Sequence, residues 1–380
     1  MQQSNKFRRL ATDRRRVCWR EGTGIAAYRD ALAHALASAG LTVEPIDDGG
    51  DAAAREALAD LPRALRGRVD GVCEGCEWRV PDLYRLAQRH FSLTGKLLEV
   101  RLPDPPPFVH WSHPLPLRLA GAANLYTVHD LIALEAPHLT GIAQGRHARL
   151  LGCVAASASH LVTVSETVRD SLRALGFADS QVTCCYQSVE TAEPGELPQG
   201  LAPGGYFLAL GRVESRKNIE RLILAHRASG SRLPLAICGP EGHWQSRAER
   251  RRVTALMQKE GMVRFGWQDG ATTAALIAGA RALLMPSLAE GFGRPVVEAM
   301  RLGVPALAST EGAAAEIAGD AALLVDPYDV EAIACGIRLL DGDDALRAKL
   351  AESGRVRARA FSLESFAQRL VGLYESLALI

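Results

Sequence analysis

Two glutamates flank a short glycine-containing loop and make this segment the best candidate for chemistry. Residues 286–303 read PSLAEGFGRPVVEAMRLG, with Glu290 and Glu298 on either side of Gly291 and Gly293. A short apolar run precedes the loop, and a proline then opens a helix that a glycine closes. Free backbone N–H groups at a helix start favour phosphate, and carboxylates accept hydrogen bonds from sugar hydroxyls. The alternative is that Glu298 only complements the helix dipole and Glu290 is a solvated loop acid.

A second candidate segment contains a cluster of cations. Residues 208–218 read LALGRVESRKN, so an apolar run ends at Gly211 and is followed by Arg212, Arg216 and Lys217. Cations that follow a strand, in the same domain as an anion-binding helix start, are suited to a diphosphate. Arg212 and Lys217 are favoured for this role over Arg216. The alternative is a surface loop with solvated side chains.

Short apolar runs alternate with helical stretches along the whole chain. Each run has 3–6 residues and is mostly apolar, which is typical of parallel strands buried on both faces. The amphipathic stretches include 25–39, 146–159 and 363–379. The predicted strands are residues 16–19, 41–46, 69–73, 107–110, 125–128, 161–164, 206–210, 235–238, 263–265, 282–285, 304–308 and 322–325.

This alternation predicts an α/β fold with two doubly wound, Rossmann-like domains. A Pro- and Gly-rich joint at residues 190–205 separates the two series. We expect a first domain at residues 1–195, a second domain at 205–362, and a last helix at 363–380 that packs back toward the first domain. Two such domains face each other across a cleft, and ligands bind beyond the carboxyl ends of the strands.

Composition excludes several classes of protein. The chain has 380 residues, of which 48% are hydrophobic, and its 44 basic and 43 acidic residues give a net charge of +1. That balance argues against nucleic acid as the main partner. No apolar stretch reaches the ~20 residues that a membrane helix requires.

The N-terminal segment is rich in arginine. Its side chains predict a solvated tail, and contact with anionic lipid is the alternative. The arginines in question are Arg8, Arg9, Arg14, Arg15, Arg16 and Arg20.

The eight cysteines are scattered, which is typical of reduced thiols in a cytoplasmic protein. Cys73 and Cys76 form a lone C-x-x-C pair, and no second ligand pair lies near enough to predict a zinc site. Neither motif segment, 208–218 or 286–303, contains a D-x-D sequence, so we expect neither a metal nor another cofactor.

The loop between the glutamates also carries a specific resemblance. E-G-F-G-x-P-x-x-E-A-M, preceded by G-R-x-x-x-R-K-N, resembles the retaining glycosyltransferases of family GT4, which have the GT-B fold. Similar segments occur at residues 22–25, 127–132, 162–166 and 312–326. The R-K-N and H-D-L-I segments most resemble bacterial mannosyltransferases that use GDP-mannose to build surface polysaccharide.

The resemblance implies that the domain at residues 1–195 lies on the acceptor side and that the domain at 205–362 binds the nucleotide-sugar donor. It also implies a role for each matching residue. Glu298 would bind the ribose of the nucleotide, and Glu290 would hold the transferred sugar. The implied catalytic residues are His129, Glu290, Arg212 and Lys217. The implied donor-binding residues are Gly24, Gly211, Gly291, Phe292, Gly293 and Glu298.

The activity implied is transfer of mannose from GDP-mannose, with retention of configuration, to a saccharide or lipid-linked saccharide. The expected location is cytoplasmic, with peripheral contact at the inner membrane face as a further alternative. A UDP-sugar donor remains the alternative for the substrate. The chain departs from the family pattern at Arg294, where an apolar residue is common, and in the polar segment before Gly22.

A different enzyme class is the main rival. Residues 22–27 fit G-x-G-x-x-A, a dinucleotide fingerprint, and Glu44 and Asp47 follow about 20 residues later. An NAD-linked oxidoreductase would explain this segment. It would leave the Glu290–Glu298 loop without a role.

Overall fold

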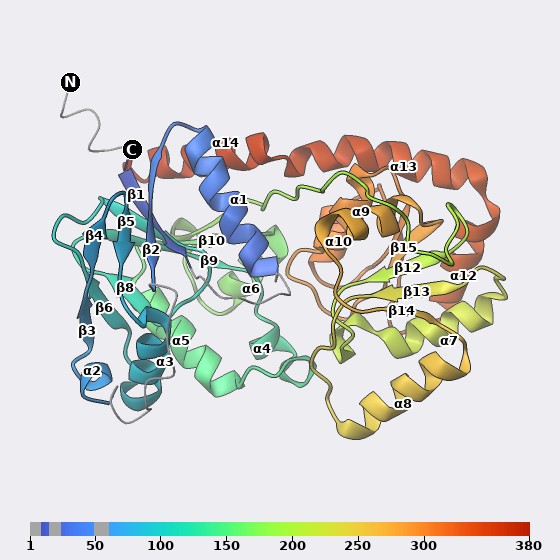
Figure 1. Ribbon diagram of the computed structural model, residues 1–380, viewed down its shortest axis with the longest axis horizontal. Coiled ribbons are helices and arrows are strands. Elements are labelled where there is room, and N and C mark those ends of the chain that lie inside the picture. Colours follow the sequence, from blue (N-terminus) through green and yellow to red (C-terminus); the bar gives the residue numbers. More distant parts are fainter. Residues whose placement is uncertain (1–8, 15–23, 49–60) are drawn as a thin grey trace.

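A computed structural model of the chain describes residues 9–14, 24–48 and 61–380, arranged in two halves (Figure 1). Each half contains a mostly parallel sheet with helices packed against it. Residues 185–206 are neither helix nor strand and connect the halves. The main expectation from the sequence, an α/β chain with two Rossmann-like sheets, is therefore confirmed.

The N-terminal half contains two sheets. Its strands are β1 (Arg9–Arg14), β2 (Thr42–Asp47), β3 (Arg68–Asp70), β4 (Val72–Glu74), β5 (Glu77–Arg79), β6 (Leu98–Arg101), β7 (Phe108–Trp111), β8 (Leu117–Leu119), β9 (Ala123–Val128), β10 (His160–Thr163) and β11 (Val182–Cys184). In the described residues the large sheet has the order β11-β10-β9-β7-β1-β2-β5-β4, and β3, β6 and β8 form a small parallel sheet. Only the β4–β5 hairpin of the large sheet is antiparallel.

The first strand corrects one prediction. β1 lies inside the large sheet, between β2 and β7, so the prediction of a solvated tail is wrong for Arg9 and Arg14. Arg9 pairs with Glu44 and Asp104, at 2.5 and 2.8 Å, and Arg14 pairs with Glu77. The strand predicted at residues 16–19 lies outside the described residues, as do the other four arginines of this segment.

The strand predicted at residues 69–73 is also wrong, because the chain divides there. Residues on one side of Gly71 form β3 of the small sheet, and those on the other side form β4 at the edge of the large sheet. Periodicity could not reveal this change of sheet, since both pieces are short and contain a valine.

The C-terminal half has a six-stranded parallel sheet in the described residues. Its strands are β12 (Phe207–Leu210), β13 (Leu235–Cys238), β14 (Val263–Phe265), β15 (Ala282–Met285), β16 (Ala306–Ser309) and β17 (Leu323–Val325). The order β14-β13-β12-β15-β16-β17 reverses direction between β12 and β15. This reversal is the switch point at which doubly wound sheets bind ligands. The two motif loops follow these two strands.

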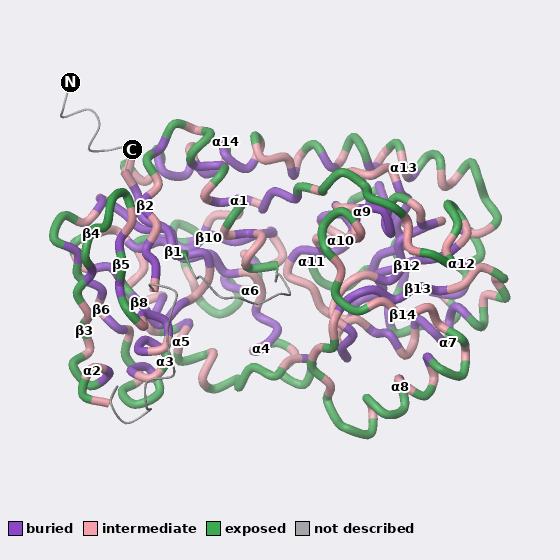
Figure 2. Tube along the Cα trace, in the orientation of Figure 1, coloured by how far each residue is buried: buried purple, intermediate pink, exposed green. Residues whose placement is uncertain are grey.

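Helices cover the faces of the sheets, and the strands between them are the most buried part of the molecule (Figure 2). In chain order the α-helices are α1 (Gly24–Ser38), α2 (Leu61–Leu65), α3 (Leu83–Thr94), α4 (Ile132–Glu135), α5 (Gln144–Ser157), α6 (Glu166–Ala174), α7 (Ile219–Ser229), α8 (Arg247–Lys259), α9 (Gly270–Ala278), α10 (Arg294–Arg301), α11 (Ala313–Ala318), α12 (Val330–Gly342), α13 (Asp344–Ala358) and α14 (Leu363–Ser376). None of the helices described is long and apolar enough to span a bilayer.

The last helix returns to the N-terminal half. The chain passes along one side of the molecule through α13, and α14 then packs against α1 (Figure 1). Two aromatic side chains of α14 are fully buried there: Phe366 lies 5.7 Å from Tyr28, and Tyr374 lies 4.9 Å from Phe108, between ring centroids. This helix therefore completes the core beneath α1.

A buried polar network lies beneath the helices of this half. His110 bonds to the hydroxyl groups of Tyr374 (2.6 Å) and Thr127 (2.8 Å), and Thr127 also bonds to Tyr28 (2.7 Å). Burial lowers the pKa of His110 to about 3 and that of His129 to about 4. Both histidines are therefore neutral in the folded protein at pH 7.

These two pKa values predict acid sensitivity. In the unfolded chain each histidine binds a proton near pH 6.5, whereas in the folded protein it stays neutral down to about pH 4 or below. The free energy of unfolding therefore has its full value above pH 6.5 and decreases as the pH falls below 6.5. From pH 7 to pH 5 the free energy of unfolding should fall by roughly 4 kcal/mol, at ~1.4 kcal/mol per pH unit for each histidine. Urea titrations at intermediate pH values measure this slope.

Two variants check the assignment. His110→Gln should reduce the slope by ~1.4 kcal/mol per pH unit, while replacement of the exposed His34 by Gln should leave it unchanged. An unaltered slope in His110→Gln would show that other groups cause the acid sensitivity.

Candidate active site

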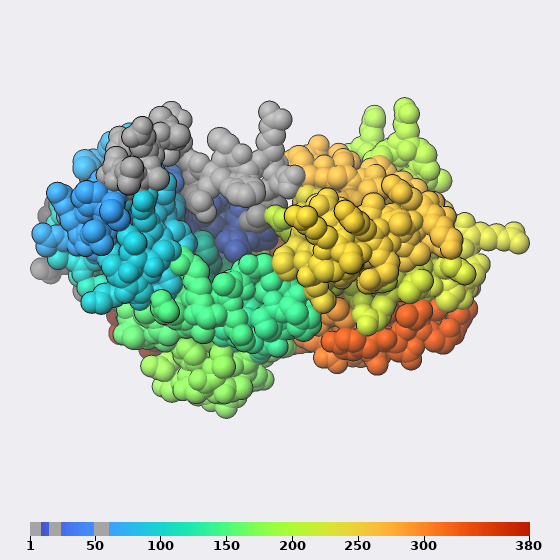
Figure 3. All heavy atoms as spheres, turned by 90° about the horizontal axis from the view of Figure 1, so that it is seen from below, coloured from blue at the N-terminus to red at the C-terminus, as the bar shows by residue number. Residues whose placement is uncertain are grey.

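A cleft of about 900 Å³ lies between the two halves of the chain. Figure 3 shows one face on which the blue and green N-terminal half meets the yellow and orange C-terminal half. All ten residues predicted from the sequence line this cleft. They are Gly24, His129, Gly211, Arg212, Lys217, Glu290, Gly291, Phe292, Gly293 and Glu298.

The loop after β12 brings its cations to the switch point. It forms a short 3-10 helix, Ser215–Lys217, and Asn218 then adopts a left-handed conformation with φ of 58° before α7 begins. The Asn218 amide donates to the carbonyl oxygens of Pro286 (3.0 Å) and Pro327 (2.6 Å). This side chain ties the loop to the neighbouring loop after β15. The sequence interpretation assigned Asn218 no role.

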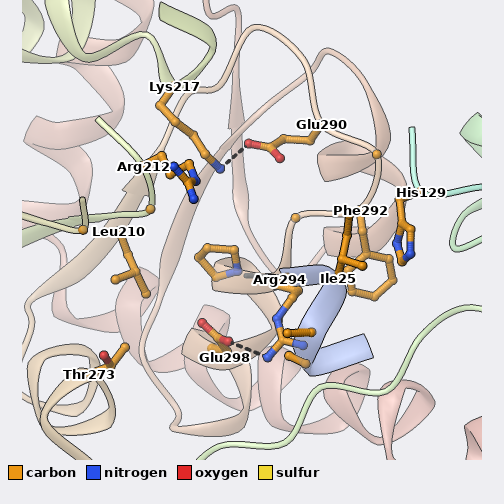
Figure 4. Close-up of a pocket in the computed structure, with 18 of the residues that line it drawn as sticks. Ile25, His129, Leu210, Arg212, Lys217, Thr273, Glu290, Phe292, Arg294 and Glu298 are labelled. Carbon is orange, nitrogen blue, oxygen red and sulfur yellow. Dashed lines mark hydrogen bonds and ion pairs between the residues drawn. The ribbon is translucent and has the colours of Figure 1, made fainter. Parts of the chain in front are cut away.

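Glu290 is the centre of a buried charge cluster. Its carboxylate accepts a hydrogen bond from Lys217 Nζ at 2.5 Å (Figure 4). It accepts another from Arg216 at 2.7 Å, and Arg216 also pairs with Glu214 at 2.8 Å. Burial alone would raise the pKa of Glu290, but Arg216 and Lys217 hold it at about 2. Burial lowers the pKa of Lys217, and Glu290 opposes that shift. Two acids and two cations thus compensate one another.

This arrangement refines the prediction for the cations. Arg216 is committed to two carboxylates, which agrees with its lower rank as a phosphate ligand. Arg212, in contrast, has no carboxylate partner among the described residues and donates only to the backbone carbonyl of Glu241, at 3.4 Å. Arg212 therefore supplies an uncompensated positive charge at this side of the cleft.

Helix α10 starts inside the cleft. Gly293 is its N-cap residue, and Pro295 occupies the first turn, as the sequence predicted. Glu298 lies one turn further on and accepts a hydrogen bond from Arg294 at 3.1 Å. The two predicted glutamates therefore lie on different elements, Glu290 before the helix and Glu298 within it (Figure 4).

The loop before α10 is in direct contact with the N-terminal half. A Cβ atom on Gly291 would overlap the carbonyl oxygen of His129 and lie 2.8 Å from Asp130 Cβ. Ser165 donates to the Gly291 carbonyl oxygen at 2.8 Å. Only glycine allows this close approach, so Gly291 is required where the halves meet.

His129 lies beside this loop as a neutral side chain. Its Nε2 donates to the carbonyl oxygen of Ser112 at 2.8 Å, which leaves Nδ1 as the acceptor nitrogen. The edge-on ring of Tyr28 lies 4.7 Å away, between centroids. A histidine held in this tautomer can accept a proton or a hydrogen bond and cannot serve as a fixed cation.

A further contact between the halves involves Glu316 of α11. Its carboxylate accepts hydrogen bonds from the backbone N–H groups of Glu166 and Thr167, both at 2.8 Å, and from the Thr167 hydroxyl at 2.6 Å. These groups begin α6, so an acid from one half caps a helix of the other. The sequence interpretation placed Glu316 in a family-like segment without this role.

The C-x-x-C pair noted in the sequence lies on an exposed hairpin. Cys73 and Cys76 are exposed and free on the β4–β5 hairpin. Within residues 9–14, 24–48 and 61–380, no group of three or more His, Cys, Asp or Glu side chains is arranged to hold a metal ion.

Comparison with known families matches both halves of the chain. A model described as Glycosyltransferase Family 4 matches residues 22–193, and one described as Glycosyl transferases group 1 matches residues 202–357. Two Rossmann-like halves on either side of a cleft are the GT-B arrangement. The two models together cover most of the chain, which belongs to the glycosyltransferases that they describe.

Individual proteins are similar over shorter or longer regions. O-antigen chain mannosyltransferase B of Escherichia coli is 34% identical over 239 residues, which cover 58% of this chain and 61% of that protein. Matches to the next two curated relatives span only 26% and 47% of their lengths.

Solved structures share the fold at lower identity. Sucrose-phosphate synthase from Thermosynechococcus elongatus has a TM-score of 0.70 at 21% identity, covering 97% of this chain and 98% of that one. Anabaena HepE in complex with UDP and glucose has a TM-score of 0.69 at 14% identity, covering 97% and 99%.

Proposed function

We propose that this chain transfers mannose from GDP-mannose to a saccharide or lipid-linked saccharide during polysaccharide biosynthesis. The observation that carries the proposal is the meeting of Arg212, the Glu290–Lys217 pair and the start of α10 in one cleft. A nucleotide diphosphate needs cations and helix N–H groups, and a sugar needs carboxylate acceptors. The similarity to a named mannosyltransferase supports mannose as the sugar.

In the proposed reaction the sugar–diphosphate bond breaks and the acceptor oxygen bonds to the same face of the sugar. Negative charge develops on the leaving diphosphate, where Arg212, Lys217 and the N–H groups at the start of α10 stabilise it. An oxygen of the departing diphosphate takes the proton of the acceptor hydroxyl. Glu298 accepts hydrogen bonds from the ribose hydroxyls. Glu290 accepts hydrogen bonds from the hydroxyls of the transferred sugar, beside His129. Neither a metal nor another cofactor takes part in the proposed reaction.

The proposed location is the cytoplasmic side of the inner membrane. Peripheral contact with anionic lipid would help a chain that uses a lipid-linked acceptor. Pairing of Arg9 and Arg14 within the fold leaves fewer arginines available for that contact.

A donor screen tests the proposal. GDP should bind at least ~10-fold more tightly than UDP, a difference of ~1.4 kcal/mol, and mannose should be transferred from GDP-mannose without added metal and in the presence of EDTA. Calorimetry measures the binding, and chromatography of the saccharide product measures the transfer.

Two variants show whether binding occurs in this cleft. Glu298→Ala should weaken the binding of GDP. Glu352→Ala, on the outer surface of α13, should leave GDP binding unchanged. Equal or tighter binding of UDP would favour the second candidate, a UDP-sugar donor, which the UDP complex of Anabaena HepE supports. Binding of neither nucleotide would remove the proposed function.

A further inference from the structure

Arg294 stands at a helix position that usually favours the opposite charge. It is the first residue of α10, where the helix dipole is positive and a cation is unfavourable. Helices α6, α12, α13 and α14 instead carry an acidic residue in their first turn. A residue that breaks a local rule at a functional cleft needs a compensating interaction.

The surroundings of Arg294 supply one such interaction in the empty cleft. Its guanidinium donates a single hydrogen bond to Glu298 at 3.1 Å, and both side chains are about one-fifth exposed. Its Cδ lies 3.9 Å from the position a Cβ of Gly24 would take, at the start of α1. Figure 4 shows Arg294 beside Glu298 and Ile25, on the side of the cleft away from Lys217. The guanidinium therefore lies near the starts of two helices.

A ribose bound at Glu298 would compete with this partner. A carboxylate only accepts hydrogen bonds, and the two hydroxyls of a ribose would compete with Arg294 for its oxygens. A single partly exposed ion pair at 3.1 Å, spaced i, i+4 with the arginine first, contributes little free energy, so Glu298 can exchange Arg294 for the ribose at low cost. After this exchange Arg294 has no anionic partner at the positive ends of two helices, unless the ligand itself supplies an anion.

We propose that Arg294 exchanges partners when the donor binds. It pairs with Glu298 in the empty cleft and passes to the diphosphate of the nucleotide when the ribose takes Glu298. The flexible side chain and planar guanidinium suit two phosphate oxygens at once. This inference rests on the proposed function, and it makes Arg294 a donor-binding residue that distinguishes nucleoside diphosphates from nucleosides.

The exchange predicts opposite effects on two ligands of one base. In Arg294→Met, guanosine should bind about twofold more tightly, because the weak competitor for Glu298 is gone. GDP should bind at least about tenfold more weakly, because a charge-assisted contact to the diphosphate is lost. Arg294→Lys should bind GDP with most of the wild-type affinity. It should restore only part of the wild-type preference for GDP over guanosine. Calorimetry with guanosine and GDP, repeated with uridine and UDP, measures these changes.

The control is an arginine–glutamate pair outside the cleft. Arg252 pairs with Glu220 at 2.6 Å, and Arg252→Met should change neither affinity. Melting temperatures of all variants check that they are folded. Equal weakening of guanosine and GDP in Arg294→Met, or unchanged GDP binding, would overturn the exchange while leaving the proposed function in place. A wild-type protein that binds neither GDP nor UDP would overturn both.

Discussion

Replacing Lys217 with methionine is expected to lower the turnover of mannosyl transfer by about 10²–10³-fold, or ~3–4 kcal/mol in the transition state. The ammonium group is held 2.5 Å from Glu290 at the edge of the cleft, so no reorganisation is needed when the diphosphate leaves. Because charge on the diphosphate grows during the reaction, kcat should fall more than the affinity for GDP. Steady-state kinetics with GDP-mannose and calorimetry with GDP separate the two.

Stability must be measured in the same variant. Lys217 is buried beside Glu290, so its removal should also lower the melting temperature, although Arg216 remains on the other carboxylate oxygen. Lys259→Met, at the exposed end of α8, is the matched control and should alter neither property. Full turnover in a folded Lys217→Met protein would reduce Lys217 to a structural partner of Glu290.

Replacing Gly291 with alanine is expected to lower turnover at least about 100-fold, since misplacement of a reacting group by about 1 Å can have that effect. The new methyl group would overlap the carbonyl oxygen of His129, so the loop that carries Glu290 must move away from the N-terminal half. That movement also breaks the hydrogen bond from Ser165. Transfer assays and the melting temperature measure the two consequences.

A glycine with free space around it provides the comparison. Gly152 lies within α5 with nothing near its missing Cβ, and Gly152→Ala should stabilise the protein by about 0.5–1 kcal/mol without loss of activity. Normal turnover in Gly291→Ala would show that the halves are apart at this point during the reaction.

Sequence patterns were most informative in the C-terminal half. The strands predicted at residues 235–238, 263–265 and 282–285 coincide with β13, β14 and β15. β13 and β15 are fully buried apolar runs inside the parallel sheet, and β14 is its partly buried edge strand. β1 escaped detection, since Leu10 and Ala11 are its only apolar residues and arginines stand at both ends. Strands such as β6 and β8 of the small sheet were missed for a similar reason, because charged residues interrupt them.

The same limit applies to the site. The spacing within each loop was enough to select Glu290, Lys217 and Glu298, and the i, i+4 spacing of Arg294 and Glu298 is itself a signal of their pairing. The contacts of Ser165 with Gly291 and of Thr167 with Glu316 join residues 126 and 149 positions apart. Such contacts depend on how the two halves are oriented, which no local pattern contains.

The return of α14 to the N-terminal half has a consequence for synthesis on the ribosome. The large sheet of that half ends at β11, yet the helix that covers its Tyr28 and Phe108 is made from residues 363–376. At about 5–20 residues per second, translation takes roughly 10–40 s to supply that helix. During this interval the nascent N-terminal half exposes apolar surface, so chaperone binding to stalled chains should decrease once residue 376 has left the exit tunnel.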